Sequence, residues 1–378
     1  MNILIYTNGF GTNLKNLYGP MSELFVEIAN QGHKLFIVTR EDLVDLNSIP
    51  INDNIKLHTV THEKGIKKFL TLKKLYDAGE NIIDENQIDV IYSHILPYLG
   101  IVAARLSSKH NIKYFSWLCG DGREQAKSSP FLERVMNHIL FYYIHKKATK
   151  MITGCEWVAK EQSELLGMDY KKKYLISPNS VKIDRFSNQT KSYRDKFKND
   201  NPIVIYSSRI TYRKGFDLFL DSVIELLNEK ENFNVIICGG GKEQDVSVLN
   251  EKIKSNHLED KIFYAGNIES KDLPNYLQSA DIFCVPARYQ GFSRAYIEAM
   301  ASGCVVVTTP AGCTPEIVEN GVTGMIVEPI INNIKEGLKK VLADENLRKT
   351  FVSNANEYVK KYSVQEVAKR YIAIFDEN

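Results

Sequence analysis

Residues Pro286–Gly303 read PARYQGFSRAYIEAMASG, a glycine-containing loop that leads into a helix, and they are the most informative part of the chain. The first backbone N–H groups of a helix lack partners within the helix and point along the positive end of its dipole. We therefore expect the turn from Gly291 to Arg294 to bind phosphate oxygens. Glu298 lies about one helical turn further along, where its carboxylate would accept hydrogen bonds from ribose hydroxyls. The stretch predicts a nucleotide ligand.

A second anion site is predicted at Ser207–Gly215, SSRITYRKG, where a strand ends and a helix begins at Gly215. Arg209 can bind a diphosphate through two parallel hydrogen bonds, and Lys214 supplies a point charge. Two cations in a loop are common, and by themselves they indicate a solvated turn. Beside a predicted nucleotide site, they favour neutralisation of a diphosphate without a metal.

Length and composition narrow the class of protein. The chain has 378 residues, 44% of them hydrophobic and 25% charged, as expected for two globular domains of ordinary size. A formal net charge of +2 gives no reason to expect a nucleic-acid partner. The N-terminus MNILIYTNG predicts a buried strand rather than a signal peptide, and no apolar run reaches the length of a membrane span. The cysteines contain no Cys-x-x-Cys pair, and we expect them to be reduced, buried and structural in a cytosolic protein: Cys119, Cys155, Cys238, Cys284, Cys304 and Cys313.

Short β-branched runs alternate with amphipathic helical patterns along the whole chain, which is typical of βαβ units and parallel sheets. The first set of predicted strands is 3–6, 34–38, 90–93, 113–117, 151–154 and 173–176. The second set is 203–207, 234–238, 262–265, 282–285, 304–308 and 325–327. Helices are expected between them, for example over 21–31, and the final segment 346–375 reads as helical throughout.

The pattern predicts an α/β protein with two doubly wound, Rossmann-like domains that face one another. We place the first domain at 1–186, a polar linker at 187–201 and the second domain at 202–355. The last helix, 356–378, is expected to pack back on the first domain. Ligands of such sheets bind outside the carboxyl ends of the strands, so the site is expected in the cleft between the domains.

These motifs together resemble the glycosyltransferase family 4 type of retaining glycosyltransferase, which has the GT-B fold, and the resemblance runs over nearly the full length. Ser208–Gly215 is similar to the diphosphate-binding motif of the family, and Tyr264–Ala287 to the segment that holds the nucleotide base. The block from Gly291 to Gly324, GFSRAYIEAMASGCVVVTTPAGCTPEIVENGVTG, resembles the most characteristic sequence of the family. SPNSVKIDRF resembles its hinge-side Pro-Asn-Gly-Val-Asp motif, with Ser180 where glycine is usual.

The resemblance implies roles for individual residues. Arg209 and Lys214 would bind the donor phosphates, and Glu298 the ribose. Gly19, before a helix, resembles the glycine-rich loop that approaches the donor phosphate, and His94 matches the active-site histidine. The predicted catalytic residues are His94, Arg209, Lys214 and Gln290. The predicted donor-binding residues are Gly19, Arg209, Lys214, Gly266, Asn267, Ile268, Gln290, Gly291, Phe292, Ser293, Arg294 and Glu298.

One residue departs from the family pattern. The family usually has two glutamates eight positions apart, and the first, which contacts the donor sugar, is here Gln290. Glutamine keeps the hydrogen-bonding reach of glutamate but loses the negative charge that would stabilise a cationic sugar in the transition state. Gln290 therefore puts in question first which sugar the donor carries, and to a lesser degree the rate of catalysis.

The implied reaction is retaining transfer of a hexose or N-acetylhexosamine from a UDP- or GDP-sugar to a hydroxyl of a glycan or lipid-linked acceptor. The chain contains no Asp-x-Asp, the usual metal–diphosphate clamp of the other large glycosyltransferase fold, so we expect neither a metal nor another cofactor. Family habit places such an enzyme in surface polysaccharide or glycolipid assembly, in the cytoplasm or at the inner face of the cell membrane.

Three other classes of protein are alternatives for this sequence. A dinucleotide-binding oxidoreductase fits poorly, because Leu14 stands where a third glycine belongs after Gly9 and Gly11. The run Gly239–Gly241 is equally consistent with a tight turn and with a donor contact. Gln290 motivates a non-catalytic GT-B subunit, and a sugar-nucleotide epimerase or hydrolase on the same fold is a third alternative.

Contact with an anionic membrane is suggested by two segments. In Glu63–Asp77, EKGIKKFLTLKKLYD, lysines surround an apolar face formed by Ile66, Phe69, Leu70 and Leu75. The segment Pro130–Lys147 has a similar mixture of aromatic and basic residues. The alternative for each is an ordinary surface helix whose apolar face packs in the core of the first domain.

Overall fold

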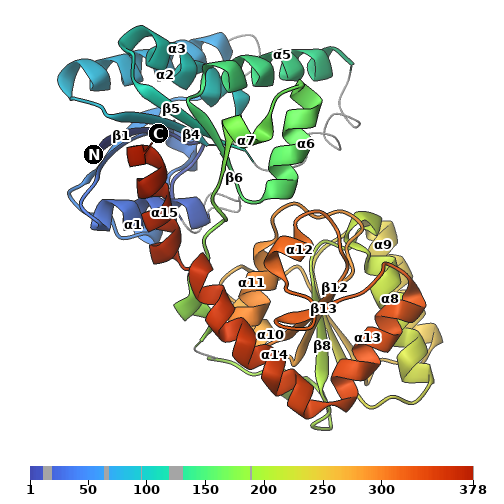
Figure 1. Ribbon diagram of the computed structural model, residues 1–378. Coiled ribbons are helices and arrows are strands. Elements are labelled where there is room, and N and C mark those ends of the chain that lie inside the picture. Colours follow the sequence, from blue (N-terminus) through green and yellow to red (C-terminus); the bar gives the residue numbers. More distant parts are fainter. Residues whose placement is uncertain (12–18, 64–67, 95, 119–130, 188–189, 378) are drawn as a thin grey trace. The chain divides into compact units, whose positions relative to one another are not determined.

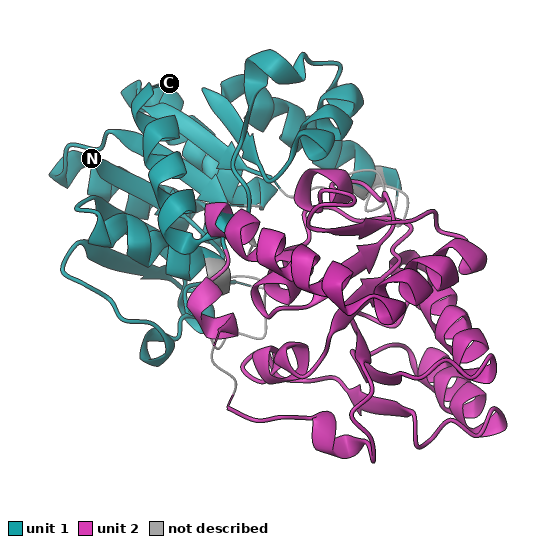
Figure 2. Cartoon of the chain, turned by 60° about the horizontal axis from the view of Figure 1, so that its bottom comes forward, with its two compact units in different colours: residues 1–180, 362–378 teal, residues 181–361 magenta. Residues whose placement is uncertain are grey.

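The chain forms two compact units, each with one parallel β-sheet covered by helices (Figures 1 and 2). The computed structural model describes residues 1–11, 19–63, 68–94, 96–118, 131–187 and 190–377. The first unit comprises residues 1–180 and 362–378, and the second comprises residues 181–361. This architecture confirms the predicted pair of doubly wound α/β domains.

The first unit is built on a seven-stranded sheet with the order β3-β2-β1-β4-β5-β6-β7, in which every pairing is parallel. Its strands are β1 (Asn2–Tyr6), β2 (Lys34–Arg40), β3 (Ile55–Val60), β4 (Val90–His94), β5 (Lys113–Trp117), β6 (Lys150–Thr153) and β7 (Tyr174–Ile176). Its helices are α1 (Gly19–Asn30), α2 (Lys68–Glu85), α3 (Pro97–His110), α5 (Phe131–Lys147), α6 (Glu156–Leu166), α7 (Tyr170–Lys173) and α15 (Val364–Glu377).

Alternate residues of the strands face two separate hydrophobic cores. Ile3 and Ile5 face a core that they share with α1 and α15. Leu4 and Tyr6 face the other core, which includes residues of α2, α3 and α5. Figure 1 shows these two helical layers on opposite sides of the sheet. The strands are therefore covered on both faces, as their continuous apolar sequences predict.

The second unit has a six-stranded parallel sheet with the order β10-β9-β8-β11-β12-β13. Its strands are β8 (Ile203–Ser207), β9 (Asn234–Cys238), β10 (Ile262–Gly266), β11 (Ile282–Val285), β12 (Val305–Thr308) and β13 (Gly324–Ile326). Its helices are α8 (Phe216–Asn228), α9 (Glu243–Ser255), α10 (Leu273–Gln278), α11 (Arg294–Ala301), α12 (Thr314–Ile317), α13 (Ile331–Ala343) and α14 (Glu345–Tyr358). In α13, Ile334, Leu338 and Val341 recur at helical spacing and are fully buried, which fixes this helix against the sheet.

The structure differs from the sequence expectations at two elements. β3 was not predicted; it is an edge strand with only its two terminal residues buried, so its apolar signal is weak. The last segment is not one helix, because the 3-10 turn η7 (Val359–Tyr362) separates α14 from α15. Ser363 caps the first turn of α15 by accepting a hydrogen bond from the N–H of Glu366 at 3.3 Å, and this Ser-x-x-Glu pattern is a helix-start signal in the sequence.

The polar stretch 187–201, expected to be a linker, belongs to the second unit. Tyr193 stacks on Tyr276 with ring centroids 3.7 Å apart, and Arg194 pairs with Asp281 at 2.7 Å. Residues 190–201 are thus anchored to the second unit by an aromatic stack and an ion pair. Neither contact was predicted, because the polar composition of this stretch is that of an exposed segment.

Cysteine burial follows the prediction among the described residues. Cys238, Cys284 and Cys304 are buried free thiols, as predicted; Cys155 and Cys313 are also buried, but they are not free thiols, so the predicted reduced state is wrong for these two. Cys119 lies outside the described residues. A search of the described helices for a stretch long and apolar enough to span a membrane finds none.

Candidate functional site

Of the predicted donor-binding residues of the second unit, Arg209, Lys214 and those between Gln290 and Glu298 lie where the strand order of its sheet reverses. β8 lies between β9 and β11, so the chain moves outward in one direction after β8 and in the other direction after β10. The Arg209 and Lys214 loop follows β8, and the stretch that contains Gln290 and Glu298 follows β11. Reversal points of this kind are where open α/β sheets bind ligands, because the two loops diverge there and leave a crevice.

The loop after β8 is held close to the end of β11 by a glycine. Residues Tyr212–Lys214 form the 3-10 turn η6, and Gly215 follows with a φ of 65°. A Cβ atom at Gly215 would lie 1.8 Å from the carbonyl oxygen of Pro286. Only glycine combines this positive φ with so close an approach, so the motif glycine brings the two phosphate loops together.

The loop after β11 ends at α11, whose N-cap is Ser293. No side chain caps this helix, so its first N–H groups are available for an anion. Glu298 is 9% exposed and lies in the second turn of the helix, with its Oε1 atom 3.9 Å from the guanidinium of Arg294. A buried carboxylate beside a helix start fits the predicted hydrogen bonding to ribose hydroxyls.

Lys214 and Gln290 are in direct contact. The Lys214 ammonium donates a hydrogen bond to Oε1 of Gln290, which is 8% exposed. The side chain of Gln290 thus gives the lysine an uncharged hydrogen-bond partner. Arg209 is exposed, and no carboxylate among the described residues pairs with it.

Arg288 ties the two loops together. Its guanidinium makes two hydrogen bonds of 2.7 Å to the carboxylate of Asp217 on α8 and lies 3.8 Å from the ring centre of Tyr212. Its backbone N–H donates to the carbonyl of Arg213 at 3.0 Å. Sequence reasoning missed this role, although Arg288 stands two residues before Gln290 in the opening stretch.

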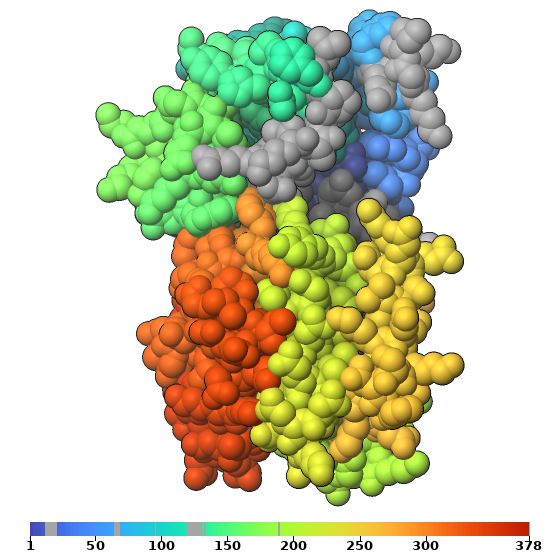
Figure 3. Space-filling view, turned by 90° about the vertical axis from the view of Figure 1, so that its right-hand side faces the viewer, coloured from blue at the N-terminus to red at the C-terminus, as the bar shows by residue number. Residues whose placement is uncertain are grey.

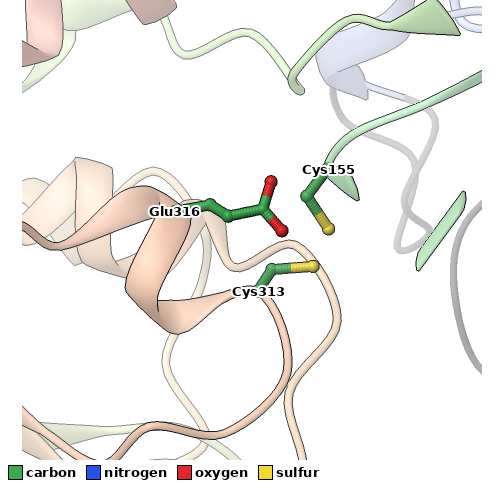
Figure 4. A group of neighbouring side chains, drawn as sticks. All are labelled: Cys155, Cys313 and Glu316. Atoms are coloured by element: carbon green, nitrogen blue, oxygen red, sulfur yellow. The ribbon is translucent and has the colours of Figure 1, made fainter. Parts of the chain in front are cut away.

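The backbone of Gln290 is also held from the start of α12. The N–H of Cys313 donates to the Gln290 carbonyl at 3.2 Å, and the N–H of Glu316 donates to the Cys313 carbonyl at 3.1 Å. Figure 4 shows the side chains of Cys313 and Glu316 on this segment. Cys313 is fully buried, so its backbone is a fixed support for the position of Gln290.

The ends of β9 and β10 lie beside the phosphate loops. Gly239 has a φ of 142°, and its N–H donates to the Gly266 carbonyl at 2.7 Å. A Cβ atom at Gly239 would lie 1.8 Å from the carbonyl oxygen of Ser208, which explains the glycine run as a close approach of backbones. Asn267, one of the residues predicted to hold the base, is exposed next to Gly240.

In the first unit, His94 is the last residue of β4 and is 1% exposed. Its Nδ1 atom lies 3.1 Å from the Tyr92 hydroxyl, and its ring stacks on Trp117 with centroids 4.6 Å apart. Burial lowers the pKa of His94 to about 3, so the imidazole is neutral at physiological pH. His94 is thus packed like a core residue. It lies at the end of β4, next to β1, where the strand order of this sheet reverses.

The loop after β1 lies at the same reversal point, because β1 is flanked by β2 and β4. Asn8 accepts a hydrogen bond of 2.5 Å from the hydroxyl of Tyr98 in α3, and the Gly11 N–H donates to Oγ of Ser22 in α1 at 3.0 Å. Gly19 is the first residue of α1. The Asn8–Tyr98 contact was not predicted, since neither residue belongs to a recognisable motif.

Family models match both units. The model described as "Glycosyl transferases group 1" matches residues 188–358, and the model "Glycosyl transferase 4-like" matches residues 13–153. The chain belongs to the family 4-like glycosyltransferases. The predicted family is therefore confirmed, and the two matches divide between the two units as two different Rossmann-like domains of one glycosyltransferase.

Relatives of this glycosyltransferase are found across distant organisms. An uncharacterized glycosyltransferase of Methanocaldococcus jannaschii is 25% identical over 86% of this chain and 85% of that protein. One component of the human phosphatidylinositol N-acetylglucosaminyltransferase is 25% identical over 99% of this chain and 76% of its own length. A protein of the Klebsiella pneumoniae cps region is 24% identical over 75% of this chain and 81% of its length.

Solved structures confirm the GT-B fold. Sucrose-phosphate synthase from Thermosynechococcus elongatus has a TM-score of 0.76 at 19% identity, covering 100% of this chain and 98% of that one. HepE from Anabaena in complex with UDP has a TM-score of 0.76 at 16% identity, with both chains covered completely. HepE has also been solved with UDP-glucose, with a TM-score of 0.70.

Proposed function

We propose that this glycosyltransferase transfers a hexose or N-acetylhexosamine from a UDP- or GDP-sugar to a hydroxyl of a glycan or glycolipid, with retention of configuration. The observation that supports the proposal most strongly is the grouping in the second unit. Arg209, Lys214 and the uncapped start of α11 follow the two strands at the reversal point of the sheet. Positive groups from both loops thus surround the position expected for a diphosphate.

In the proposed reaction, the bond between the anomeric carbon and the diphosphate oxygen breaks, and its electrons pass to the diphosphate. The acceptor oxygen forms its bond to the anomeric carbon from the same face, and its proton passes to the departing phosphate. Arg209, Lys214 and the N–H groups near Ser293 would stabilise the charge that develops on the leaving group. One well-placed donor of this kind contributes about 3 kcal/mol.

The donor contacts follow from the same geometry. Glu298 would bind the ribose, and the backbone from Gly266 to Ile268 would bind the base. We propose that the two cations make a divalent metal unnecessary. Solved structures of similar fold hold UDP and UDP-glucose, which supports a uridine diphosphate as the first donor to test.

Three residues are proposed to act around the sugar and the acceptor. Gln290 would contact the donor sugar while it orients Lys214. His94 would present a neutral imidazole to a hydroxyl of the sugar or acceptor, and Gly19 would approach the donor phosphate. We propose that the transfer serves surface polysaccharide assembly on the cytoplasmic side of the membrane.

The decisive test is thermal stabilisation of the protein by UDP, GDP, ADP and their sugar conjugates, in the presence of EDTA. A ligand at about a hundred times its dissociation constant adds roughly 2.7 kcal/mol to the free energy of unfolding. We expect one nucleotide to stabilise the wild type and not Glu298→Ala. Glu251→Ala, which removes an exposed glutamate from α9, is the matched control and should respond like the wild type.

Sugar transfer is then measured with the donor so identified. Stabilisation that requires a divalent metal would overturn the metal-independent mechanism. Stabilisation without transfer, but with free or epimerised sugar as product, would indicate a hydrolase or epimerase. No stabilisation by any nucleotide would favour a non-catalytic GT-B subunit.

A further inference from the structure

Two helices of the first unit combine apolar and basic side chains, and the structure distinguishes them. In the described part of α2, Leu75 is 1% exposed and belongs to the core, and Leu72 packs against the same core. Phe69, at 61%, is the one described large apolar residue of this helix that is strongly exposed. The described part of α2 therefore packs as an ordinary amphipathic surface helix, which was the alternative given for Glu63–Asp77; residues 64–67, with Ile66, lie outside the described residues.

α5 has a different character, because apolar side chains cover its outer face as well as its inner face. Ile144 is buried in the core of the first unit. On the outside, Phe131, Val135, Ile139 and Tyr142 are exposed by 68%, 40%, 59% and 44%. Their spacing of four, four and three residues places them in one line along the helix, which we call the outer stripe.

Met136, exposed by 61%, lies beside the outer stripe. In the space-filling view, the bluish green side chains of α5 lie on the surface of the first unit (Figure 3). Soluble proteins seldom expose a continuous line of large apolar side chains unless the line contacts a partner. The outer stripe therefore indicates a docking surface.

A group of lysines adjoins the C-terminal end of the outer stripe. Lys146 lies one turn after Tyr142, and the Lys173 ammonium donates to the carbonyl of Ala148 just past the helix. Lys150 donates to the Lys172 carbonyl at 3.0 Å, which joins the start of β6 to α7. The lysine cluster consists of Lys146, Lys147, Lys150, Lys171, Lys172 and Lys173.

Among the described residues, no member of the lysine cluster forms a salt bridge with a carboxylate, and the Glu156 carboxylate interacts electrostatically with Lys171 alone of the cluster. Burial, and in second place the nearby charge of Lys150, lower the pKa of Lys173, as expected where cations crowd together. At the other end of the stripe, Arg134 is exposed and lies 5.6 Å from the ring centre of Phe131. Described cations thus stand at both ends of the apolar line.

We propose that the outer stripe and the lysine cluster dock the first unit on an anionic phospholipid surface. Such a surface provides hydrocarbon for the stripe and a dense negative charge for the lysines. A second copy of the chain is a poorer occupant. With the two α5 helices either parallel or antiparallel, Arg134 or the lysine cluster of one copy would meet cations of the other.

The test is co-sedimentation of the full chain with vesicles of phosphatidylcholine, with and without phosphatidylglycerol. We expect binding to the anionic vesicles alone, weakened by added salt. Lys146→Glu combined with Lys171→Glu and Lys172→Glu should weaken this binding on the order of a hundredfold, since each lysine contributes about fivefold. Val135→Ser combined with Ile139→Ser should weaken it about tenfold at unchanged charge.

Two substitutions on α2 are the matched controls. Phe69→Ser removes an equally exposed aromatic residue, and Lys73→Glu reverses an equally exposed lysine of the same unit. Both controls should bind anionic vesicles like the wild type. All the substituted side chains are exposed, so the melting temperatures should stay unchanged, which would show that every variant is folded.

The proposal is overturned if the wild type does not sediment with anionic vesicles, or if the α5 variants bind as the controls do. A concentration-dependent dimer that Val135→Ser with Ile139→Ser abolishes would instead show that the stripe binds a second copy. Nucleotide binding in the second unit is measured separately by thermal stabilisation. Failure of membrane docking and failure of the proposed transferase function are therefore distinguishable.

Discussion

At the scale of single residues, the contact between Lys214 and Gln290 gives the lysine of the donor site an uncharged partner. Glutamine accepts a hydrogen bond from the lysine without neutralising it. A glutamate at this position would form a partly buried ion pair, and the lysine would then have to leave a carboxylate to bind a phosphate. The glutamine therefore favours phosphate binding while it removes a negative charge from the sugar side.

We predict that Gln290→Glu weakens binding of the nucleoside diphosphate about tenfold, which corresponds to roughly 1.4 kcal/mol. The dissociation constant is measured by calorimetry with the donor nucleotide. Gln290→Ala is the control, because it removes the contact without adding a charge. Tighter binding together with a large gain in turnover for Gln290→Glu would contradict the prediction and support decay from an ancestral glutamate.

Arg288 is predicted to be a positioning residue of the same site. Arg288→Ala removes the two hydrogen bonds to Asp217 and the contact with Tyr212. Because the ion pair is partly exposed, we expect a loss of stability of no more than about 1 kcal/mol. Donor affinity should fall several-fold, since the two loops lose their link.

The matched control for Arg288 is Arg194→Ala. Arg194 pairs with Asp281 at 2.7 Å in the same unit, but Asp281 precedes β11 and so lies at the amino-terminal ends of the strands, whereas the site lies at their carboxyl ends. This variant should lose a similar amount of stability and keep its donor affinity. Equal loss of donor affinity in both variants would show that Arg288 acts through general stability alone.

At the scale of elements, the site depends on how closely the loops after β8 and β11 approach each other. Gly215→Ala would place a methyl group 1.8 Å from the Pro286 carbonyl oxygen, so one loop must move. Gly167, the C-cap of α6, has almost the same φ of 64° but no atom within 4 Å of the added methyl group. Comparing Gly167→Ala with Gly215→Ala therefore separates two contributions to the loss of stability: the positive φ, which both positions share, and the steric clash, which only Gly215 has.

We predict that Gly167→Ala lowers the free energy of unfolding by about 1 kcal/mol and leaves donor binding unchanged. Gly215→Ala should cost clearly more and should abolish stabilisation by the nucleotide. Denaturant unfolding measured with and without the nucleotide checks both effects. Equal losses in the two variants would mean that the loop after β11 adjusts freely.

At the scale of the whole molecule, the histidines are distributed unequally. Of eight histidines, only His257 belongs to the second unit. Burial lowers the pKa of His94 to about 3 and that of His145 to about 4, from an ordinary value of 6.5. Between these values the unfolded chain binds protons that the folded first unit does not bind. Stability is therefore complete above about pH 6.5 and is lost as the pH falls.

We predict that the first unit loses roughly 1.4 kcal/mol per pH unit for each of these two histidines between pH 6.5 and about 4. Both tryptophans, Trp117 and Trp157, belong to the first unit, so tryptophan fluorescence reports on its unfolding. His145→Asn should lower stability at neutral pH and halve the slope below it. A flat profile over this window would contradict the prediction.

Much of the fold could be predicted from local sequence. The strands of both sheets are continuous apolar runs because helices cover them on both faces, and that signal is strong. β3 escaped prediction because an edge strand needs fewer apolar residues, and the break before α15 was missed although Ser363 and Glu366 form a capping pattern. The phosphate-binding motifs could be predicted because their helix starts, glycines and cations lie close together in the chain.

By itself, the sequence determined the family, the two parallel sheets and the residues of the donor motifs, since each depends on residues that are neighbours along the chain. Tertiary structure decided what Gly215 and Arg288 do, because their partners Pro286, Asp217 and Tyr212 are brought near only when β8 and β11 pair. It also decided which amphipathic helix packs most of its described apolar side chains in the core, since Phe69 is the one described large apolar residue of α2 that is strongly exposed. α2 and α5 have similar composition, and only the position of each helix on the sheet determines whether its apolar side chains meet the core or the solvent.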